Sequence, residues 1–194
     1  IIVDFNNKKF IDFTSSIFVT NIGHSNKYVK KAIKTVLNSN LIHSYTYLNK
    51  FRVSYIKELV EFCGDHFEKA YLASSGTEAT ETALKLAFHH TKKKKIIYFD
   101  GSYHGRTGYS LLSSDMKGVN KNYFYNNNFI KCEFNNIKDF KKKFHKYKKD
   151  LAAVIIEPIQ ATSGFIFSNK KFLQYLYKCL KDCPALLIFD ETWT

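Results

Sequence analysis

Two hydroxyl residues flank a glycine, Ser75-Gly76-Thr77, where a short apolar stretch gives way to a helical pattern. Ser75 is placed to cap that helix, and Glu78, three residues after it, completes the sequence pattern of a capping box. A strand, a turn of small residues and a helix start together present backbone N–H groups and the positive end of a helix dipole, which suits an anion such as a phosphate. A merely well-capped helix would look the same, because the stretch has neither the glycines nor the lysine of a P-loop.

Three further groups that could do chemistry follow apolar runs later in the chain. Tyr103-His104 offers a flat aromatic face, and Glu157 and Asp190 each come directly after a continuous apolar run. A flat heteroaromatic phosphate ester could use the anion seat, the aromatic face and a carboxylate together. A carboxylate that faces a ring nitrogen keeps that nitrogen protonated, which makes the ring a better electron sink.

Each of these residues also has an ordinary structural explanation. Tyr103 could be a packing residue and His104 a residue at a helix start. Glu157 could simply end a strand. Asp190-Glu191 could be a polar strand terminus or, with Glu157, a site for a hard cation. Their joint order along the chain is what favours a shared site.

The elements that must position these groups alternate between strand and helix. Apolar runs predict strands, and apolar residues three and four positions apart predict helices. We expect strands at 71–74, 96–99, 129–134, 151–156 and 185–189, and helices at 76–90, 108–113, 137–147 and 169–181. Apolar strands separated by helices indicate an α/β fold with a mainly parallel sheet sandwiched by helices. Ligands bind outside the carboxyl ends of such strands, where all four groups are expected to lie.

The first part of the chain predicts smaller elements. Alternating apolar and polar residues around Asn6-Asn7-Lys8 indicate a hairpin within residues 1–13. Ser25 is the expected cap of a helix over 27–38. A second helix, with apolar residues from 53 to 63, is expected to stop near Gly64.

The composition is typical of a globular protein, with 45% hydrophobic and 16% aromatic residues in a chain of 194. The formal charge of +13 invites a nucleic-acid-binding interpretation. However, Arg52 and Arg106 are the only arginines, whereas surfaces that read bases favour arginine. Solvated lysine faces explain the charge better, so we expect no nucleic-acid partner.

The cysteines and the hydropathy of the sequence indicate the cellular compartment that we expect for the protein. The four cysteines form no CxxC pair, so we expect no metal site and no disulfide framework, and we predict a cytoplasmic protein with reduced thiols. No apolar run approaches about 18 residues, so we expect no membrane span. Because the sequence begins at Ile1 rather than Met and stops just after an acidic pair, we expect a fragment of a longer protein.

Several motifs, in order, resemble the class III aminotransferases of the ornithine and 4-aminobutyrate type, which are pyridoxal-phosphate enzymes of fold type I. The motifs are Phe10-Ile11-Asp12-Phe13, Asn21-Ile22-Gly23-His24, Ser75-Gly76-Thr77-Glu78-Ala79, Tyr103-His104-Gly105-Arg106-Thr107, Ile156-Glu157-Pro158-Ile159-Gln160 and Leu187-Ile188-Phe189-Asp190-Glu191. The resemblance covers the whole length. It implies that residues 1–49 are the N-terminal part of a small domain and a connection, and that residues 50–194 are an incomplete large domain that binds the cofactor.

The resemblance assigns pyridoxal 5′-phosphate as the cofactor. Ser75, Gly76 and Thr77 would bind its phosphate through backbone N–H groups and a hydroxyl. Tyr103 would stack on its pyridine ring, and His104 would support the pocket.

The resemblance also assigns the acidic end of the site. Asp190 would pair with the protonated ring nitrogen, and Glu157 would orient that end of the site. The Schiff-base lysine of the family would fall after Thr194, so this chain would contain no catalytic nucleophile and would be inactive alone.

Two stretches depart from the pattern of the family. Many members carry a glutamate that pairs with a substrate-gating arginine where this chain has Ala161-Thr162-Ser163-Gly164, so we assign neither the ornithine nor the 4-aminobutyrate subfamily. Trp193 stands where several members have a glutamine that contacts the ring hydroxyl of the cofactor. Because tryptophan cannot accept a hydrogen bond, that hydroxyl needs another partner, or Trp193 shapes the substrate pocket.

The activity implied is transfer of an amino group from an amine or amino acid to an oxo acid, through a lysine aldimine, in a homodimer. Aminomutases of the same family, which move an amino group within one molecule, are the close alternative; Arg106-Thr107 after Tyr-His-Gly favours the transferase. From another class, a lysine-rich α/β module could bind nucleic acid or an acidic partner. The scarcity of lysine around Gly76 and Asp190 argues against that module.

Overall fold

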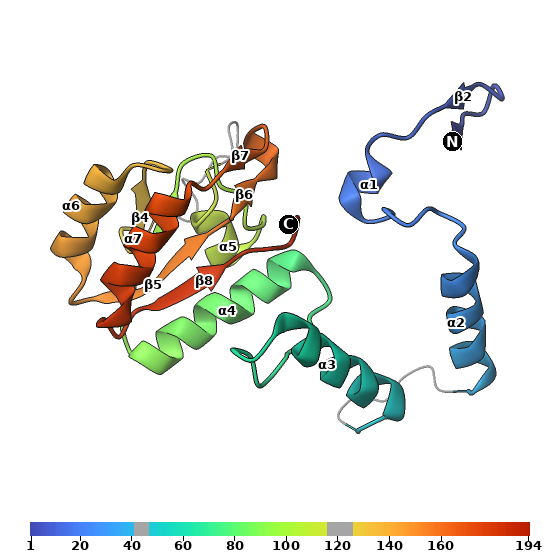
Figure 1. Cartoon of the computed structure of the whole chain (residues 1–194), viewed down its shortest axis with the longest axis horizontal. Coiled ribbons are helices and arrows are strands. Elements are labelled where there is room, and N and C mark those ends of the chain that lie inside the picture. Colours follow the sequence, from blue (N-terminus) through green and yellow to red (C-terminus); the bar gives the residue numbers. More distant parts are fainter. Residues whose placement is uncertain (41–46, 116–125) are drawn as a thin grey trace. The chain divides into compact units, whose positions relative to one another are not determined.

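A computed structural model of the chain describes residues 1–40, 47–115 and 126–194. The chain divides into two units, Ile1–Tyr71 and Leu72–Thr194, whose elements are labelled in Figure 1. The second unit carries every residue predicted for the site. The predicted domain boundary after residue 49 concerns the complete protein and stays a prediction.

The first unit consists of small elements. Strands β1 (Ile2–Val3) and β2 (Lys9–Phe10) pair in antiparallel fashion, which confirms the predicted hairpin. Helices α1 (Ser15–Phe18), α2 (Lys27–Asn38) and α3 (Lys50–Cys63) follow.

The ends of α2 and α3 show how the sequence sets helix limits. The cap of α2 is Asn26 and not Ser25, because the Asn26 side chain accepts hydrogen bonds from the amides of Tyr28 and Val29. The second helix stops at Gly64 as expected, where φ is +88°, a conformation that favours glycine. No described residue of 1–71 is buried, and apolar residues such as Val29 and Ile33 of α2 and Val53 of α3 are exposed.

The second unit is built on a four-stranded sheet. Its strands are β3 (Lys95–Phe99), β4 (Phe129–Cys132), β5 (Leu151–Ile156) and β8 (Leu186–Phe189), in the order β4-β3-β5-β8. All three pairings are parallel, which confirms the predicted sheet. The strand predicted at 71–74 was wrong: these residues form no strand, because they pair with none of the described strands and a strand needs such a ladder.

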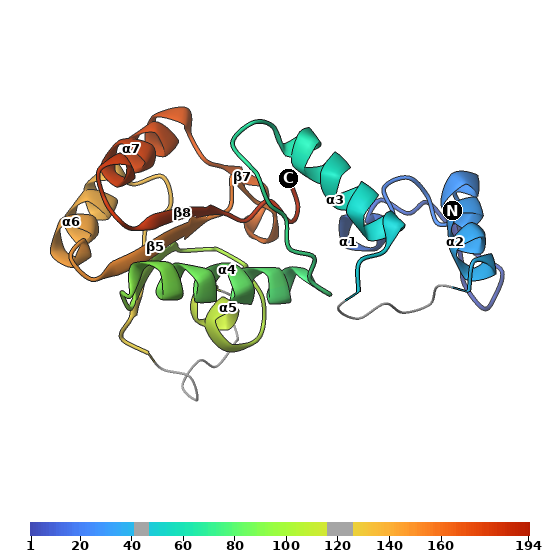
Figure 2. The same cartoon turned by 90° about the horizontal axis from the view of Figure 1, so that it is seen from below.

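Helices cover both faces of this sheet, as Figure 2 shows. Helices α6 (Ile137–Tyr147) and α7 (Lys170–Lys181) lie on one face, and α4 (Gly76–Thr91) and α5 (Gly108–Leu112) lie on the other. Alternate residues of β3 serve the two faces, since side chains of a strand point to opposite sides. Ile97 and Phe99 pack with the core under α6 and α7, whereas Ile96 packs with the core under α4.

A short hairpin follows β5 and leads into α7. It consists of β6 (Ile159–Gln160), the turn η2 (Ala161–Ser163) and β7 (Ile166–Phe167). Gln160 donates from Nε2 to the carbonyl of Asp100 at 2.8 Å, and the Ser163 hydroxyl donates to the carbonyl of Gly101 at 2.6 Å. These bonds fasten the hairpin to the turn that follows β3.

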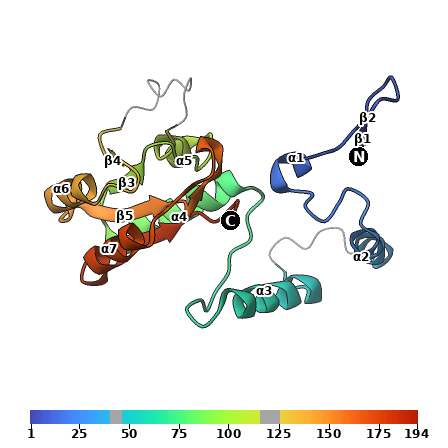
Figure 3. The same cartoon turned by 45° about the horizontal axis from the view of Figure 1, so that its top comes forward.

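Because the strands are parallel, the carboxyl ends of β3, β5 and β8 lie at the same end of the sheet (Figure 3). The segments after these strands, together with the start of α4, carry the residues predicted for the site. In the described part of the chain, no helix is both long and apolar enough to cross a membrane.

Candidate functional site

The start of α4 has the capped local structure that the sequence predicted. Ser75 is extended, with φ −157°, and its hydroxyl accepts from the amide of Glu78 at 3.1 Å, as the cap prediction requires. The capping box differs by one residue, because the Glu78 carboxylate accepts from the amide of Ser74 at 2.7 Å and not from that of Ser75. The Gly76 and Thr77 amides belong to the first helical turn, whose N–H groups have no acceptor within the helix.

Two glycines allow three segments to meet at this point. A Cβ on Gly76 would lie 3.2 Å from Cγ2 of Thr192, so the turn after β8 approaches the helix start closely. Gly105 has φ +138°, and a Cβ there would lie 2.5 Å from the hydroxyl of Ser110 and 2.7 Å from that of Thr77. Glycine at both positions lets the loop after β3 and the turn after β8 pack against α4.

A buried histidine and an aspartate form the polar floor of the site. Nδ1 of His104 lies 2.7 Å from Oδ2 of Asp190, and the two side chains are 0% and 8% exposed. Burial alone would raise the pKa of Asp190, but the hydrogen bond and charge interaction with His104 and the bonds from Thr192 outweigh it and lower that pKa. Asp190 is therefore ionised at neutral pH. This pairing places a proton on Nδ1, and Nε2 has no hydrogen-bond partner among the described residues.

Glu157 is a second carboxyl group on the same cavity, with the opposite protonation behaviour. It is 5% exposed, and its Oε2 accepts from the backbone amide of Tyr103 at 2.9 Å. Burial, helped by the nearby charge of Asp190 and opposed by the Tyr103 amide, raises the pKa of Glu157 to about 8. Glu157 thus carries a proton at neutral pH, while Asp190 carries a charge.

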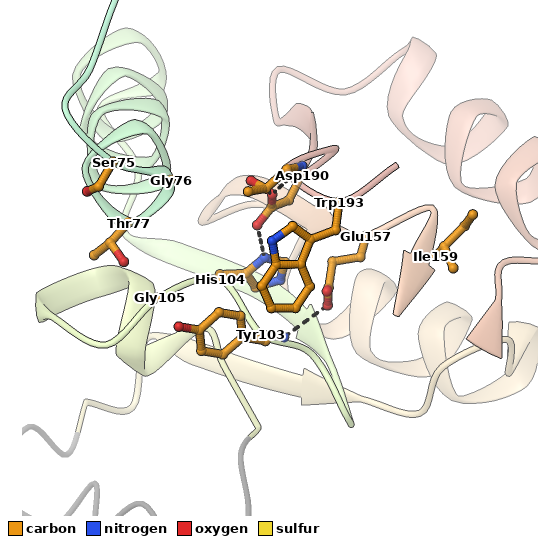
Figure 4. A pocket seen from close by; sticks show the side chains of 11 residues that line it. Ser75, Gly76, Thr77, Tyr103, His104, Gly105, Glu157, Ile159, Asp190 and Trp193 are labelled. Carbon is orange, nitrogen blue, oxygen red and sulfur yellow. Dashed lines mark hydrogen bonds and ion pairs between the residues drawn. The ribbon is translucent and has the colours of Figure 1, made fainter. Parts of the chain in front are cut away.

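One face of the Tyr103 ring is covered by a neighbouring ring. The Tyr103 ring is stacked on the indole of Trp193, with ring centroids 5.4 Å apart and planes inclined by 18°. Figure 4 shows both rings together with His104, Glu157 and Asp190. One of the two faces of the Tyr103 ring therefore contacts a side chain of the same chain.

All of these groups line one cavity of about 190 Å³ within the second unit. The lining residues are Ser75, Gly76, Thr77, Tyr103, His104, Gly105, Glu157, Ile159, Asp190, Thr192 and Trp193. The structure thus brings together every cofactor-binding residue predicted from the sequence. None of the lining residues is a lysine or arginine.

Three lining residues were missed. Gly105 directly follows Tyr103-His104, and a glycine at that place was the signal that could have singled it out, since the structure gives it a positive φ. Thr192 could have been found from its position two residues after Asp190, at hydrogen-bonding distance from that carboxylate. Ile159 gave no signal, because an apolar residue in a strand looks like an ordinary core residue.

The structure also bears on the cation site and on the argument from Arg106-Thr107. No three His, Cys, Asp or Glu side chains of the described residues are grouped to hold a metal ion. Arg106, which favoured the transferase over the aminomutase, is exposed and does not line the cavity. Thr107 beside it is the N-cap of α5, which gives that residue a structural role.

Comparisons with known proteins match the whole length of the chain to one family. The family described as class-III aminotransferases matches residues 1–194. The chain is 35% identical to a glutamate-1-semialdehyde 2,1-aminomutase of Clostridium acetobutylicum, over 95% of this chain and 45% of that protein. It is also 35% identical to an acetylornithine aminotransferase of the same organism, over 97% of this chain and 49% of that protein.

A solved structure has the same fold. The β-phenylalanine aminotransferase of Variovorax paradoxus superimposes with a TM-score of 0.84 at 27% identity, over 99% of this chain and 43% of that one. The chain therefore spans a little under half the length of these relatives. Its parallel sheet between helices is that of fold type I transaminases. The family match over every residue and the identity to named members establish that this chain belongs to the class III aminotransferase family.

Proposed function

We propose that the complete protein is a pyridoxal-phosphate-dependent aminotransferase, which moves an amino group from an amine or amino acid to an oxo acid. One observation carries the proposal: the start of α4, the Tyr103 ring and the ionised Asp190 face a single cavity. A phosphate, a flat ring and a protonated ring nitrogen need these three partners together.

The residues present fit the cofactor. The first amides of α4, with the Thr77 hydroxyl, would hold its phosphate. Asp190 would face the ring nitrogen, and its contact with the buried His104 supports the orientation of the carboxylate. When bound, pyridoxal phosphate supplies an electron sink for the bond broken at the amine-bearing carbon.

The other contributions of these residues are to control charge and to hold groups in position. Asp190, kept ionised, would hold a proton on the ring nitrogen of the bound cofactor, and the protonated Glu157 adds no second negative charge to the site. Glu157 also holds the Tyr103 backbone through the 2.9 Å hydrogen bond to its amide. These roles of Ser75, Gly76, Thr77, Tyr103, His104, Glu157, Asp190 and Trp193 are part of the proposal.

Fixation of the cofactor tests the proposal. Borohydride treatment of the complete protein with pyridoxal phosphate should attach the cofactor to the lysine that holds it, and peptide mass should locate that lysine after Thr194, one strand and turn beyond Asp190. Absence of any modified lysine would overturn the proposal, and the lysine-rich binding module would then be preferred. Residues 1–194 alone should not transaminate; activity of that piece would contradict the expected position of the lysine.

The aminomutase remains a second candidate for a specific reason. The chain is as similar to the aminomutase as to the acetylornithine aminotransferase, at 35% identity to both. A product assay with and without an added oxo acid separates the two, because only a transferase requires the acceptor.

We also propose a homodimer in the cytoplasm. The lack of any buried residue among those described in 1–71 is consistent with a surface that another part of the assembly covers. The four cysteines are free thiols, as is usual in a reducing compartment. Sedimentation of the complete protein tests the dimer.

A further inference from the structure

Glu81 of α4 contacts the beginning of α5, although it does not line the cavity. Its Oε1 accepts a hydrogen bond from the backbone amide of Ser110 at 2.7 Å. A Cβ on Gly108 would lie 3.0 and 3.1 Å from the two carboxylate oxygens, so both oxygens lie against the first turn of α5. Glu81 therefore ties together two helices that lie side by side on the same face of the sheet (Figure 2).

Two buried serines connect α5 to the loop that carries Tyr103 and His104. The hydroxyl of Ser110, in α5, lies against Gly105, since a Cβ on that glycine would be 2.5 Å from it. The hydroxyl of Ser114, just after α5, accepts from the His104 amide at 2.8 Å and donates to the Gly105 carbonyl at 3.2 Å. Both serines are fully buried. A displacement of α5 would therefore displace the backbone of this loop.

The two parts of the proposed site come from the two segments that Glu81 connects. The start of α4 carries the proposed phosphate seat, and the loop after β3 carries the Tyr103 ring. The helices also meet where the rings of Phe88 and Tyr109 pack edge to face, with centroids 5.1 Å apart. Phe88 lies about two turns beyond Glu81 along α4, so the Glu81 contact is the nearer of these two to the phosphate seat.

We propose that Glu81 is a positioning residue that sets the spacing between the phosphate seat and the Tyr103 ring. It acts through α5 on the loop and touches no ligand itself. The proposal rests on the proposed function for the identity of the ligand. A ligand that reaches both places needs the correct spacing between them, whereas a ligand that reaches only one place does not.

Three probes distinguish the spacing from the two places themselves. Pyridoxal phosphate reaches both, inorganic phosphate reaches only the seat, and pyridoxal reaches only the ring position. Calorimetric titration of the complete protein, freed of cofactor, measures the Kd of each probe. In Glu81→Ala we expect the Kd of pyridoxal phosphate to rise about tenfold, because a misplaced second contact loses effective concentration, and the other two Kd values to change by less than about twofold.

Weakening of either single-place probe as large as that of pyridoxal phosphate would overturn the proposal. It would mean that the variant damages a binding place rather than the spacing between the two places.

Three further variants complete the test. Glu81→Gln keeps the length of the side chain and an oxygen acceptor for the Ser110 amide, so it should bind pyridoxal phosphate within about twofold of the wild type. Gly108→Ala pushes on the carboxylate from the α5 side and should reproduce the selective loss, which keeps the proposal testable if Glu81→Ala does not fold. Lys85→Ala is the control, because Lys85 is exposed about one turn further along α4. A loss in Glu81→Gln equal to that in Glu81→Ala would overturn the role of the hydrogen bond.

The outcomes also separate this proposal from the proposed function. Binding of pyridoxal phosphate by the wild type, with the same Kd in Glu81→Ala, would overturn the positioning role and leave the proposed function standing. Failure of the wild type to bind pyridoxal phosphate would overturn both.

Discussion

At the scale of single residues, the site depends on two carboxyl groups that the fold treats differently. Glu157 and Asp190 lie on the same cavity, yet the pKa of Glu157 is raised to about 8 and that of Asp190 is lowered. The difference follows from their partners, since Glu157 accepts one backbone amide whereas Asp190 contacts His104 and Thr192. A single negative charge in a buried cavity is the result.

Stability should therefore fall with rising pH in a defined window. Because the pKa of Glu157 rises from 4.5 to about 8 on folding, the folded state binds more protons between these values, and its free energy of unfolding decreases as pH rises through them. Glu157→Gln keeps an acceptor for the Tyr103 amide but does not titrate. Urea unfolding at pH 5 and pH 8 should show a loss of a few kcal/mol in the wild type and a much smaller loss in Glu157→Gln. Equal losses in both proteins would contradict the assignment.

Gly105 offers a second test at the same scale. Gly105→Ala combines an unfavourable φ of +138° with a Cβ that would lie 2.5 Å from the Ser110 hydroxyl, whereas Gly164→Ala has φ +94° and no atom within 4 Å. We expect Gly105→Ala to cost about 3 kcal/mol or more and Gly164→Ala about 1 kcal/mol, as measured by urea unfolding. Equal costs would mean that the close approach of the three segments contributes nothing.

At the scale of elements, α4 both stabilises the fold and carries the proposed anion seat. Its N-cap bond from the Glu78 amide to Ser75 lies at the edge of the cavity, and Leu84 and Ala87 on the same helix are fully buried against the sheet. The helix therefore cannot shift its start without disturbing the core. The packing therefore makes the proposed phosphate seat rigid.

Substitutions of Ser75 separate the two roles of α4. Ser75→Ala should cost about 1 kcal/mol of stability, because it removes the cap. Ser75→Asp keeps a capping oxygen and should retain that stability, but it places a negative charge where a phosphate would bind. Equilibrium dialysis with pyridoxal phosphate should show much weaker binding for Ser75→Asp than for Ser75→Ala. Undiminished binding by Ser75→Asp would place the phosphate elsewhere.

Element prediction from sequence succeeded where one physical signal dominates. The continuous apolar run gave β5 at the predicted residues 151–156, and the amphipathic pattern gave α6 at 137–147. The expectation that ligands bind at the carboxyl ends of strands then located the cavity. Two predictions were wrong, the cap at Ser25 and the strand at 71–74. Which of two neighbouring residues caps a helix, and whether an apolar stretch finds a strand to pair with, depend on contacts that a local sequence pattern does not contain. The stack of Trp193 on Tyr103 joins residues 90 positions apart by number, and no spacing predicts it.

At the scale of the whole chain, burial is very unequal between the two units. Every fully buried residue of the core lies in Leu72–Thr194, whereas none of the described residues of Ile1–Tyr71 is buried. Most of the stabilising apolar burial therefore belongs to the second unit.

Hydrogen exchange should reveal this inequality. In the chain of residues 1–194, amides of β5 should exchange last, because all its residues are buried, and amides of α2 should exchange early. Mass spectrometry of peptic fragments from α2 and β5 measures both in one sample. Protection of α2 equal to that of β5 would contradict the burial found here.

The two edges of the sheet differ in a way that bears on handling the chain. In the part of the chain that the structure describes, β4 forms one edge and carries Lys131, whereas β8 forms the other with only apolar side chains, of which Phe189 is 45% exposed. An uncharged open edge is a template on which other chains can add strands. The charge of +13 opposes that encounter, and salt screens it. For the piece 1–194 taken alone, self-association should therefore begin at β8 and accelerate as ionic strength rises, so dilute buffers of low salt are the conditions under which that piece stays dispersed.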